Sequence, residues 1–152
     1  MTKQKLIIVL NNIRSRENVG SIFRTADAAG VSKIYLCGIT PTPPHEKISK
    51  TALGAEEYVP WEYHKQTWRL LDKLKKDKIN IVTLEQSKEG VDLFKFKPKF
   101  PLALVVGNEV RGLSPQILKY CDKKISIPMY GKKESLNVAV ATGVAVYVIL
   151  DS

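Results

Sequence analysis

Three short stretches of the chain combine polar and turn residues in a pattern typical of catalytic or ligand-binding loops: Asn18 to Arg24, Gly107 to Ser114 and Ile127 to Val138. Ser135 and Asn137 can orient polar groups, and Glu109 can accept hydrogen bonds or hold an arginine. Ser135 and Asn137 also precede an apolar segment with the pattern of a buried helix. The start of such a helix presents free N–H groups and the positive end of its dipole, which suits a small polar ligand.

The elements that must position these stretches alternate between strands and helices. Apolar runs at 6–10 and 101–106 are typical of strands buried on both faces, and further strands are predicted at 33–37, 80–84 and 124–127. Helices are predicted from a cap at Asn18 to Gly30, around 47–53, over 66–78, at Pro115, and from a cap at Ser135 through residue 150. The pattern predicts one α/β domain, residues 1–152, with a mostly parallel sheet flanked by helices.

Because ligands of parallel sheets bind outside the carboxyl ends of the strands, the three stretches could converge on one site. In the first helix, four apolar residues recur at helical spacing and predict the core stripe: Val19, Ile22, Phe23 and Ala26. Arg24 and Asp27 lie off that stripe. Arg24 is therefore either free to face the site or a surface arginine paired with Asp27.

The last helix, Val138 to Leu150, is apolar at nearly every position and is predicted to be buried on most sides. One small domain cannot cover so much apolar helix, and its small residues would let another helix approach closely. The sequence therefore predicts a homodimer.

Composition limits which binding partners and which cellular compartment the protein can have. The chain carries 24 basic and 15 acidic residues, a net charge of +9, which suits a polyanion such as nucleic acid but also solubility alone. The apolar tracts are too short for a signal peptide or a membrane span of ~20 residues, so we expect a cytoplasmic protein without membrane contact. Cys37 and Cys121 are isolated and expected to be reduced; His45 and His64 have no ligand-spaced partners, so no metal site is expected.

Several common enzyme classes lack their motifs. The pair Gly107 and Gly112 resembles half of a phosphate-binding loop, but Leu113 and Ser114 follow where a lysine is needed. No G-x-G-x-x-G follows the first strand and no G-x-S-x-G is present, which argues against dinucleotide binding and serine hydrolysis. The 107–114 stretch could be only a tight turn, but Glu109 and Arg111 beside an apolar strand favour a function.

The three stretches resemble the three signature motifs of the SpoU or TrmH type RNA 2'-O-ribose methyltransferases of the SPOUT superfamily. Asn18, Gly20 and Arg24 match motif one, N-x-G-x-x-x-R. Residues 107–114 match motif two, and residues 127–138 match the I-P-M-x-G and S-L-N-V parts of motif three. The resemblance spans most of the chain, and all three motifs are intact.

The resemblance implies a Rossmann-like SPOUT fold with a C-terminal deep trefoil knot, S-adenosylmethionine as methyl donor, and a homodimer with the site near the interface. It implies that Arg24 is the catalytic arginine and that four polar residues serve the same site: Asn18, Glu109, Ser135 and Asn137. The implied cofactor-binding residues are Gly107, Asn108, Glu109, Gly112, Ile127, Met129, Ser135, Leu136, Asn137 and Val138.

The resemblance also implies a structured RNA as substrate, with tRNA preferred over rRNA. We expect no additional RNA-binding domain, so RNA would contact the catalytic domain itself through basic residues: Arg14, Arg16, Arg24, Lys47, Lys50, Arg111, Lys132 and Lys133. The alternative is a catalytically idle RNA-binding dimer, or a scaffold that uses its basic surface alone. The intact motif residues argue against that alternative.

Overall fold

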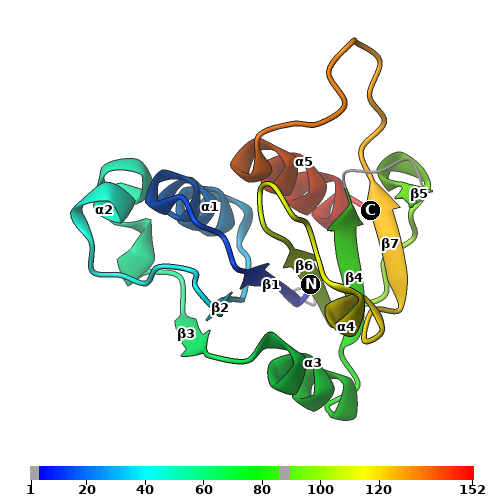
Figure 1. The fold of residues 1–152 in the computed structure, drawn as a ribbon, viewed down its shortest axis with the longest axis horizontal. Coiled ribbons are helices and arrows are strands. Elements are labelled where there is room, and N and C mark those ends of the chain that lie inside the picture. Colours follow the sequence, from blue (N-terminus) through cyan, green and yellow to red (C-terminus); the bar gives the residue numbers. More distant parts are fainter. Residues whose placement is uncertain (1–3, 86–89) are drawn as a thin grey trace.

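The computed structural model describes residues 4–85 and 90–152, which contain a seven-stranded sheet with helices on both faces (Figure 1). Its strand order is β3-β2-β1-β6-β4-β7-β5, and every pairing between neighbours is parallel. The strands are β1 (Leu6–Asn11), β2 (Lys33–Cys37), β3 (Trp61–His64), β4 (Asn80–Glu85), β5 (Val91–Asp92), β6 (Leu102–Val106) and β7 (Lys123–Ser126). The α/β class and parallel sheet predicted from sequence are confirmed.

Within the described residues, four α-helices lie between strands: α1 (Arg16–Ala29), α2 (Glu46–Ala52), α3 (Thr67–Lys76) and α4 (Pro115–Leu118). A fifth, α5 (Val138–Leu150), follows the last strand. The described residues also contain two short 3-10 helices, η1 (Ala55–Glu57) and η2 (Leu93–Lys95). The sequence predicts an irregular link over 85–100; it contains β5 and η2, and its residues 86–89 lie outside the described part of the chain. The trefoil knot stays a prediction.

Two apolar clusters, one on each face of the sheet, hold the layers together. Alternate residues of β1 point to opposite faces: Leu6, Ile8 and Leu10 pack with α1, α2 and α5, whereas Ile7 and Val9 pack with α3 and α4. The predicted stripe on α1 is fully buried in the first cluster. These strands are buried on both faces, which explains their continuous apolar sequences.

The residues that cap the N-termini of α1 and α5 differ from the predicted ones. Ser15, not Asn18, caps α1 by accepting a hydrogen bond from the Asn18 backbone N–H, and Asn137, not Ser135, caps α5 by accepting from Ala139 and Val140. Each cap satisfies N–H groups that have no partner inside the helix. The Asn18 side chain is therefore free to make other hydrogen bonds, whereas the Asn137 side chain is held in place by capping α5.

The burial of α5 is narrower than predicted. One side of the helix packs on the sheet, but Val140 and Tyr147 are 53% and 52% exposed, and Gly143 and Val144 between them are half-buried. Within this chain α5 therefore keeps an uncovered apolar stripe, because the neighbouring α1 covers only part of its outer surface. In the described part of the chain, no helix is long and apolar enough to cross a membrane.

Candidate active site

The loop after β6 turns back sharply and is fixed by the side chain of Asn108. Its Oδ1 accepts hydrogen bonds of 2.9 Å from the backbone N–H groups of Val110 and Arg111, and its Nδ2 donates to the carbonyl of Asn12 at 2.8 Å. Gly112 completes the turn with a left-handed backbone, φ 67°, which favours glycine. Asn108, predicted to bind cofactor, thus shapes the 107–113 loop and ties it to the loop after β1.

Glu109 connects the same two loops through its carboxylate. Oε1 accepts from the backbone N–H of Arg14 and Oε2 from that of Ser15, both at 3.1 Å, and Asn18 Nδ2 also donates to Oε2 at 3.5 Å. Burial acts to raise the pKa of Glu109, but its own backbone N–H, those of Arg14 and Ser15, and the Asn18 amide hold it below the usual value. The carboxylate therefore stays ionised and is a weak proton acceptor.

Asn18 links Glu109 to the start of α5. Its Nδ2 donates to Glu109, while its Oδ1 accepts a hydrogen bond of 3.2 Å from Asn137 Nδ2. The Oδ1 of Asn137 in turn accepts from the first N–H groups of α5. One chain of hydrogen bonds thus joins Glu109, Asn18 and Asn137, and the three sequence motifs meet as predicted.

A cavity of about 330 Å³ lies beside Glu109 at the carboxyl ends of β4 and β6. Six of the predicted cofactor-binding residues line it: Gly107, Asn108, Glu109, Gly112, Ser135 and Val138. Apolar walls come from Leu84, Val106, Leu113 and Ala141, which sequence reasoning missed. Leu84 and Val106 lie at strand ends and Ala141 lies inside an apolar helix, which are positions that core residues share, whereas Leu113 lies in the loop of motif two.

The cavity suits S-adenosylmethionine in size and chemistry. Sites for small ligands and cofactors are apolar clefts of roughly 300–1,000 Å³ with a few polar groups. Apolar side chains here could hold an adenine ring, and Glu109 and Ser135 supply polar groups at the edge. At Gly107 an added Cβ would lie 2.7 Å from the Gly112 carbonyl carbon and from Leu113 Cγ, so only glycine permits this close approach of the loop.

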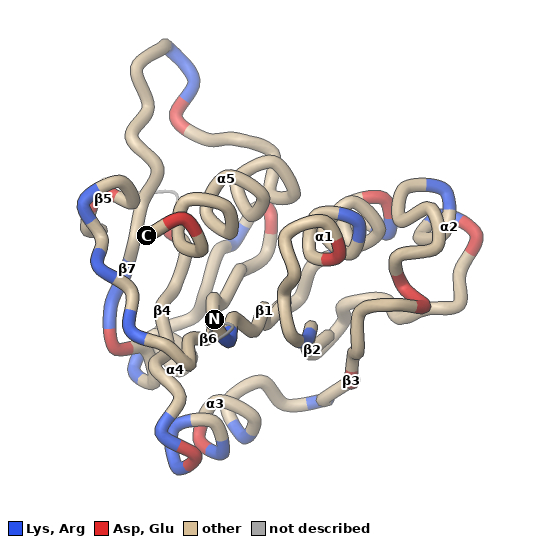
Figure 2. Tube along the Cα trace, turned by 180° about the vertical axis from the view of Figure 1, so that it is seen from behind, with Lys and Arg blue, Asp and Glu red and all other residues tan. Residues whose placement is uncertain are grey.

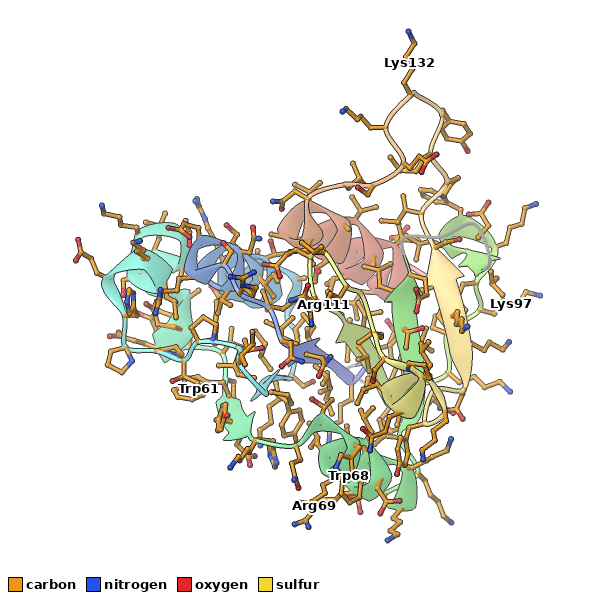
Figure 3. The ribbon with its side chains drawn as sticks, in the orientation of Figure 1. Trp61, Trp68, Arg69, Lys97, Arg111 and Lys132 are labelled. Carbon is orange, nitrogen blue, oxygen red and sulfur yellow. The ribbon has the colours of Figure 1, made fainter. Side chains whose placement is uncertain are left out.

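The remaining predicted cofactor residues belong to the loop between β7 and α5. Ile127, Met129 and Leu136 line a small cavity that adjoins the larger one and shares Leu84, Glu85 and Ala141 with it. Figure 1 shows this 127–137 loop projecting from the body, and Figure 3 shows Lys132 at its tip pointing away from it. Asn137 lines neither cavity, because its side chain caps α5.

Arg24 does not join this cluster in the single chain. It is exposed on α1 and lines neither the cavity beside Glu109 nor the small cavity that adjoins it. No ion pair joins it to Asp27 among those residues, so the structure gives no support to the surface-pair interpretation. Gly20, between Asn18 and Arg24 in motif one, permits close packing, because a Cβ there would collide with the Ile48 carbonyl and Thr51.

The predicted RNA-binding residues are exposed but occupy different regions. Arg14 and Arg111 line a second, larger cavity, Arg16, Lys47 and Lys50 lie on α1 and α2, and Lys132 and Lys133 lie on the 127–137 loop. Figure 2 shows further basic residues gathered along the β7 edge and at α3. Among the described residues, no group of three or more His, Cys, Asp or Glu side chains could hold a metal ion.

Comparison with known proteins identifies the family. The family model described as SpoU rRNA Methylase matches residues 5–147, which include all of the motifs above. The chain belongs to the SpoU rRNA methylase family. It is 38% identical over 146 residues to the tRNA (guanosine(18)-2'-O)-methyltransferase of Aquifex aeolicus, covering 95% of this chain and 68% of that protein. It is 34% identical to the 23S rRNA (guanosine-2'-O-)-methyltransferase RlmB of Neisseria meningitidis, covering 94% of this chain and 57% of the relative.

Solved structures of SpoU proteins share the fold. The AviRb methyltransferase of Streptomyces viridochromogenes in complex with AdoMet (S-adenosylmethionine) superposes with a TM-score of 0.89 at 27% identity, covering 99% of this chain and 58% of that one. A structure described as giving insight into 2-OH methylation of C/U34 on tRNA has a TM-score of 0.86 at 26% identity, covering 97% and 95%. The chain thus spans 57% and 58% of the Neisseria and Streptomyces proteins and 95% of the protein in the tRNA methylation structure.

Ser15 is the residue of the SpoU site that sequence reasoning missed most clearly. It caps α1, its backbone N–H binds Glu109, and its hydroxyl also donates to Glu17. A serine followed two residues later by an acid in the first helical turn is a helix-start signal that was available. Asparagine is an equally good cap, and only the structure shows that the Asn18 side chain is turned toward Glu109 and Asn137.

Proposed function

We propose that this protein transfers a methyl group from S-adenosylmethionine to a ribose 2'-hydroxyl of RNA, with tRNA as the substrate, in the cytoplasm. The observation that carries the proposal is the hydrogen-bonded chain Glu109–Asn18–Asn137, which joins all three family motifs beside a cavity of cofactor size. Support for tRNA comes from the 38% identical Aquifex enzyme and from the tRNA-associated structure that this chain matches over nearly its full length.

The sulfonium, when bound, would supply an activated methyl group; transfer would join this methyl to the ribose oxygen, leave the demethylated thioether, and release the hydroxyl proton to water. The residues of this chain must then align the two reactants and stabilise the developing oxygen anion. Glu109 and Asn108 hold the cavity loop in place. We assign Glu109 a positioning role, because its hydrogen bonds and low pKa make it a poor base.

Ligand binding and product mapping test this proposal. Calorimetry should show binding of S-adenosylmethionine and of its demethylated product, and no binding of ATP or NAD, because the chain lacks their motifs. RNA from cells with and without the protein should differ by 2'-O-methylation at one tRNA position. Tight binding of ATP or NAD without any response to the methyl donor would overturn the activity, and a lost mark in rRNA would overturn the choice of tRNA.

We also propose a homodimer that covers the uncovered stripe of α5. A shallow hollow of about 480 Å³ on this face is lined by residues of both α1 and α5, including Asn18, Ser21, Thr25, Asn137 and Tyr147. Two members of the hydrogen-bonded site, Asn18 and Asn137, therefore reach the surface that a second subunit would cover. Such a dimer would place the site near the interface and could carry Arg24 of one subunit to the partner's cavity.

Substituting Tyr147 with glutamate should separate the subunits. Burying an unpaired carboxylate in an apolar interface costs several kcal/mol, so we expect light scattering at micromolar concentration to change from twice the 17.0 kDa chain mass to a single chain mass. Tyr58, which is 75% exposed and lies next to η1, provides the matched control, since Tyr58→Glu should remain dimeric. A wild-type monomer at this concentration would contradict the proposed dimer.

A further inference from the structure

A cavity of about 1030 Å³ lies on the other side of the 107–113 loop from the proposed cofactor cavity. One wall is this loop, the floor is the end of β1 and the segment after it, and the opposite wall is the start of α3. Asn108, Val110, Arg111, Gly112 and Leu113 line both cavities, so the loop is a partition between them. We call the larger cavity the α3 groove.

The charged residues that line the α3 groove are all basic. Arg14, Lys65 and Arg111 line it, and no aspartate or glutamate is among its lining residues. The three cations come from different parts of the chain, namely the segment before α1, the segment before α3, and the 107–113 loop. All three are exposed. Cations brought together in a concave surface raise the local concentration of anionic ligands such as phosphodiesters.

Two asparagines held by hydrogen bonds, Asn11 and Asn12, form the floor of the α3 groove. Asn11 is only 6% exposed, and its Oδ1 accepts from the Thr67 hydroxyl. Within residues 4–85 and 90–152 its side-chain Nδ2 has no partner, although Asn11 lines the groove. Asn12 is held in a left-handed conformation, φ 56°, and its Oδ1 accepts from Ile39 N–H. The Asn11 amide can therefore donate a hydrogen bond to a polar ligand in the groove.

Flat and apolar surfaces complete the groove. Trp68 stands on the α3 wall, where the Arg69 guanidinium lies 5.3 Å from its ring centroid, and Figure 3 shows Trp68 on α3 and Arg111 near the end of β1. Ile39 and Val110, which are 65% and 87% exposed, also line the groove. An aromatic ring beside cations is the combination by which proteins hold unpaired nucleotides, since bases stack on the ring and phosphates contact the cations.

We propose that the α3 groove binds a nucleotide of the RNA strand that flanks the methylated one, with its base against Trp68 and its phosphate between Lys65 and Arg111. This inference rests on the proposed RNA methylation. The shared loop places the flanking nucleotide and the cofactor on opposite sides of one partition, so an RNA strand crossing that loop engages both cavities. Binding in the groove thereby sets which nucleotide reaches the methyl donor.

Tryptophan fluorescence tests occupancy directly. Trp61 and Trp68 are the only tryptophans, so Trp61→Phe leaves Trp68 as the single reporter. A 12-nucleotide oligouridine and an unmodified tRNA transcript should each quench its emission saturably, whereas adenosine monophosphate at the same concentration should not. Quenching by the mononucleotide alone would show a site for a free nucleotide and overturn the proposal.

Two variants assign the RNA contacts to the groove. Lys65→Gln should weaken RNA binding about fourfold at ~0.15 M salt and lower the slope of log affinity against log salt by about 0.7, as expected for one lost phosphate contact. Trp68→Leu should weaken it about tenfold through lost stacking. Lys73→Gln, an exposed lysine on α3 outside the groove, is the control and should change neither quantity.

The outcomes separate this inference from the proposed function. If the protein methylates RNA but Trp68 emission does not respond and Lys65→Gln binds RNA like the control, the groove assignment is wrong and the activity stands. If Trp68 is quenched and both variants weaken RNA binding while no RNA is methylated, the groove assignment stands and the activity is wrong.

Discussion

Arg24→Ala is expected to abolish methyl transfer while leaving S-adenosylmethionine affinity and dimerisation nearly unchanged. Arg24 is exposed and does not line the proposed cofactor cavity beside Glu109, so its loss removes no lining residue of that cavity. Its proposed contribution is a cation near the ribose oxygen at the transition state, a kind of interaction worth roughly 10²–10³ in rate. Single-turnover methylation measures this step, and calorimetry measures cofactor affinity.

Asp27→Ala is the matched control for Arg24→Ala, because Asp27 is the exposed acid one turn further along α1. It should methylate RNA at the wild-type rate. Arg24→Lys should remain severely impaired, because lysine keeps the charge but loses the planar fork of the guanidinium. If Arg24→Ala transfers methyl groups at a near wild-type rate, Arg24 is an ordinary surface residue and the catalytic assignment fails.

Mixed dimers show which subunit Arg24 serves. A dimer of one Arg24→Ala subunit and one Asn137→Ala subunit contains an intact Asn137 site that can receive Arg24 only from its partner. Activity in the mixed dimer, and none in either parent, would place Arg24 across the interface. An inactive mixed dimer of correct composition would mean that Arg24 serves the site of its own chain.

Apolar periodicity was enough to predict the layers of the fold. The continuous runs that became β1 and β6 are buried on both faces, and the α1 stripe of Val19, Ile22, Phe23 and Ala26 is buried without exception. These patterns are informative because burial dominates the energetics of such segments. Strand order was not predictable in the same way, since β6 lies between β1 and β4 through contacts distant in sequence.

Polar residues were predicted as a group more accurately than one by one. The convergence of Asn18, Glu109 and Asn137 is confirmed, but their individual roles differ from expectation. The two asparagine amides each offer donors and an acceptor, and the Glu109 carboxylate offers two acceptor oxygens. Sequence cannot tell which of these groups are used locally and which across the site. Asn137 caps α5 where Ser135 was expected to, and Glu109 accepts hydrogen bonds, which is one of its two expected roles, from backbone N–H groups and not from a ligand.

Glu109→Gln is expected to destabilise the fold and to slow methyl transfer. Both carboxylate oxygens of Glu109 accept backbone N–H groups, whereas a glutamine has one oxygen and turns an NH₂ group toward the second donor. An unsatisfied donor costs about 1–3 kcal/mol, which corresponds to a fall in melting temperature of roughly 2–12 °C for a domain of this size. Misalignment of the 107–113 loop should lower the rate by about 10²-fold.

The pH dependence of stability identifies the carboxylate as the cause. Because the pKa of Glu109 is lower in the folded protein, its contribution is fully present above its unfolded pKa of about 4.3 and is lost as the pH falls through the lowered folded value. The difference in unfolding free energy between wild type and Glu109→Gln should thus be constant from neutral pH down to about pH 5 and shrink below pH ~4. Glu57→Gln, at an exposed glutamate of η1, should match wild type throughout. A Glu109→Gln protein as stable as this control at neutral pH would show that the hydrogen bonds from Arg14 and Ser15 do not hold the loop, and the positioning role of Glu109 would then be wrong.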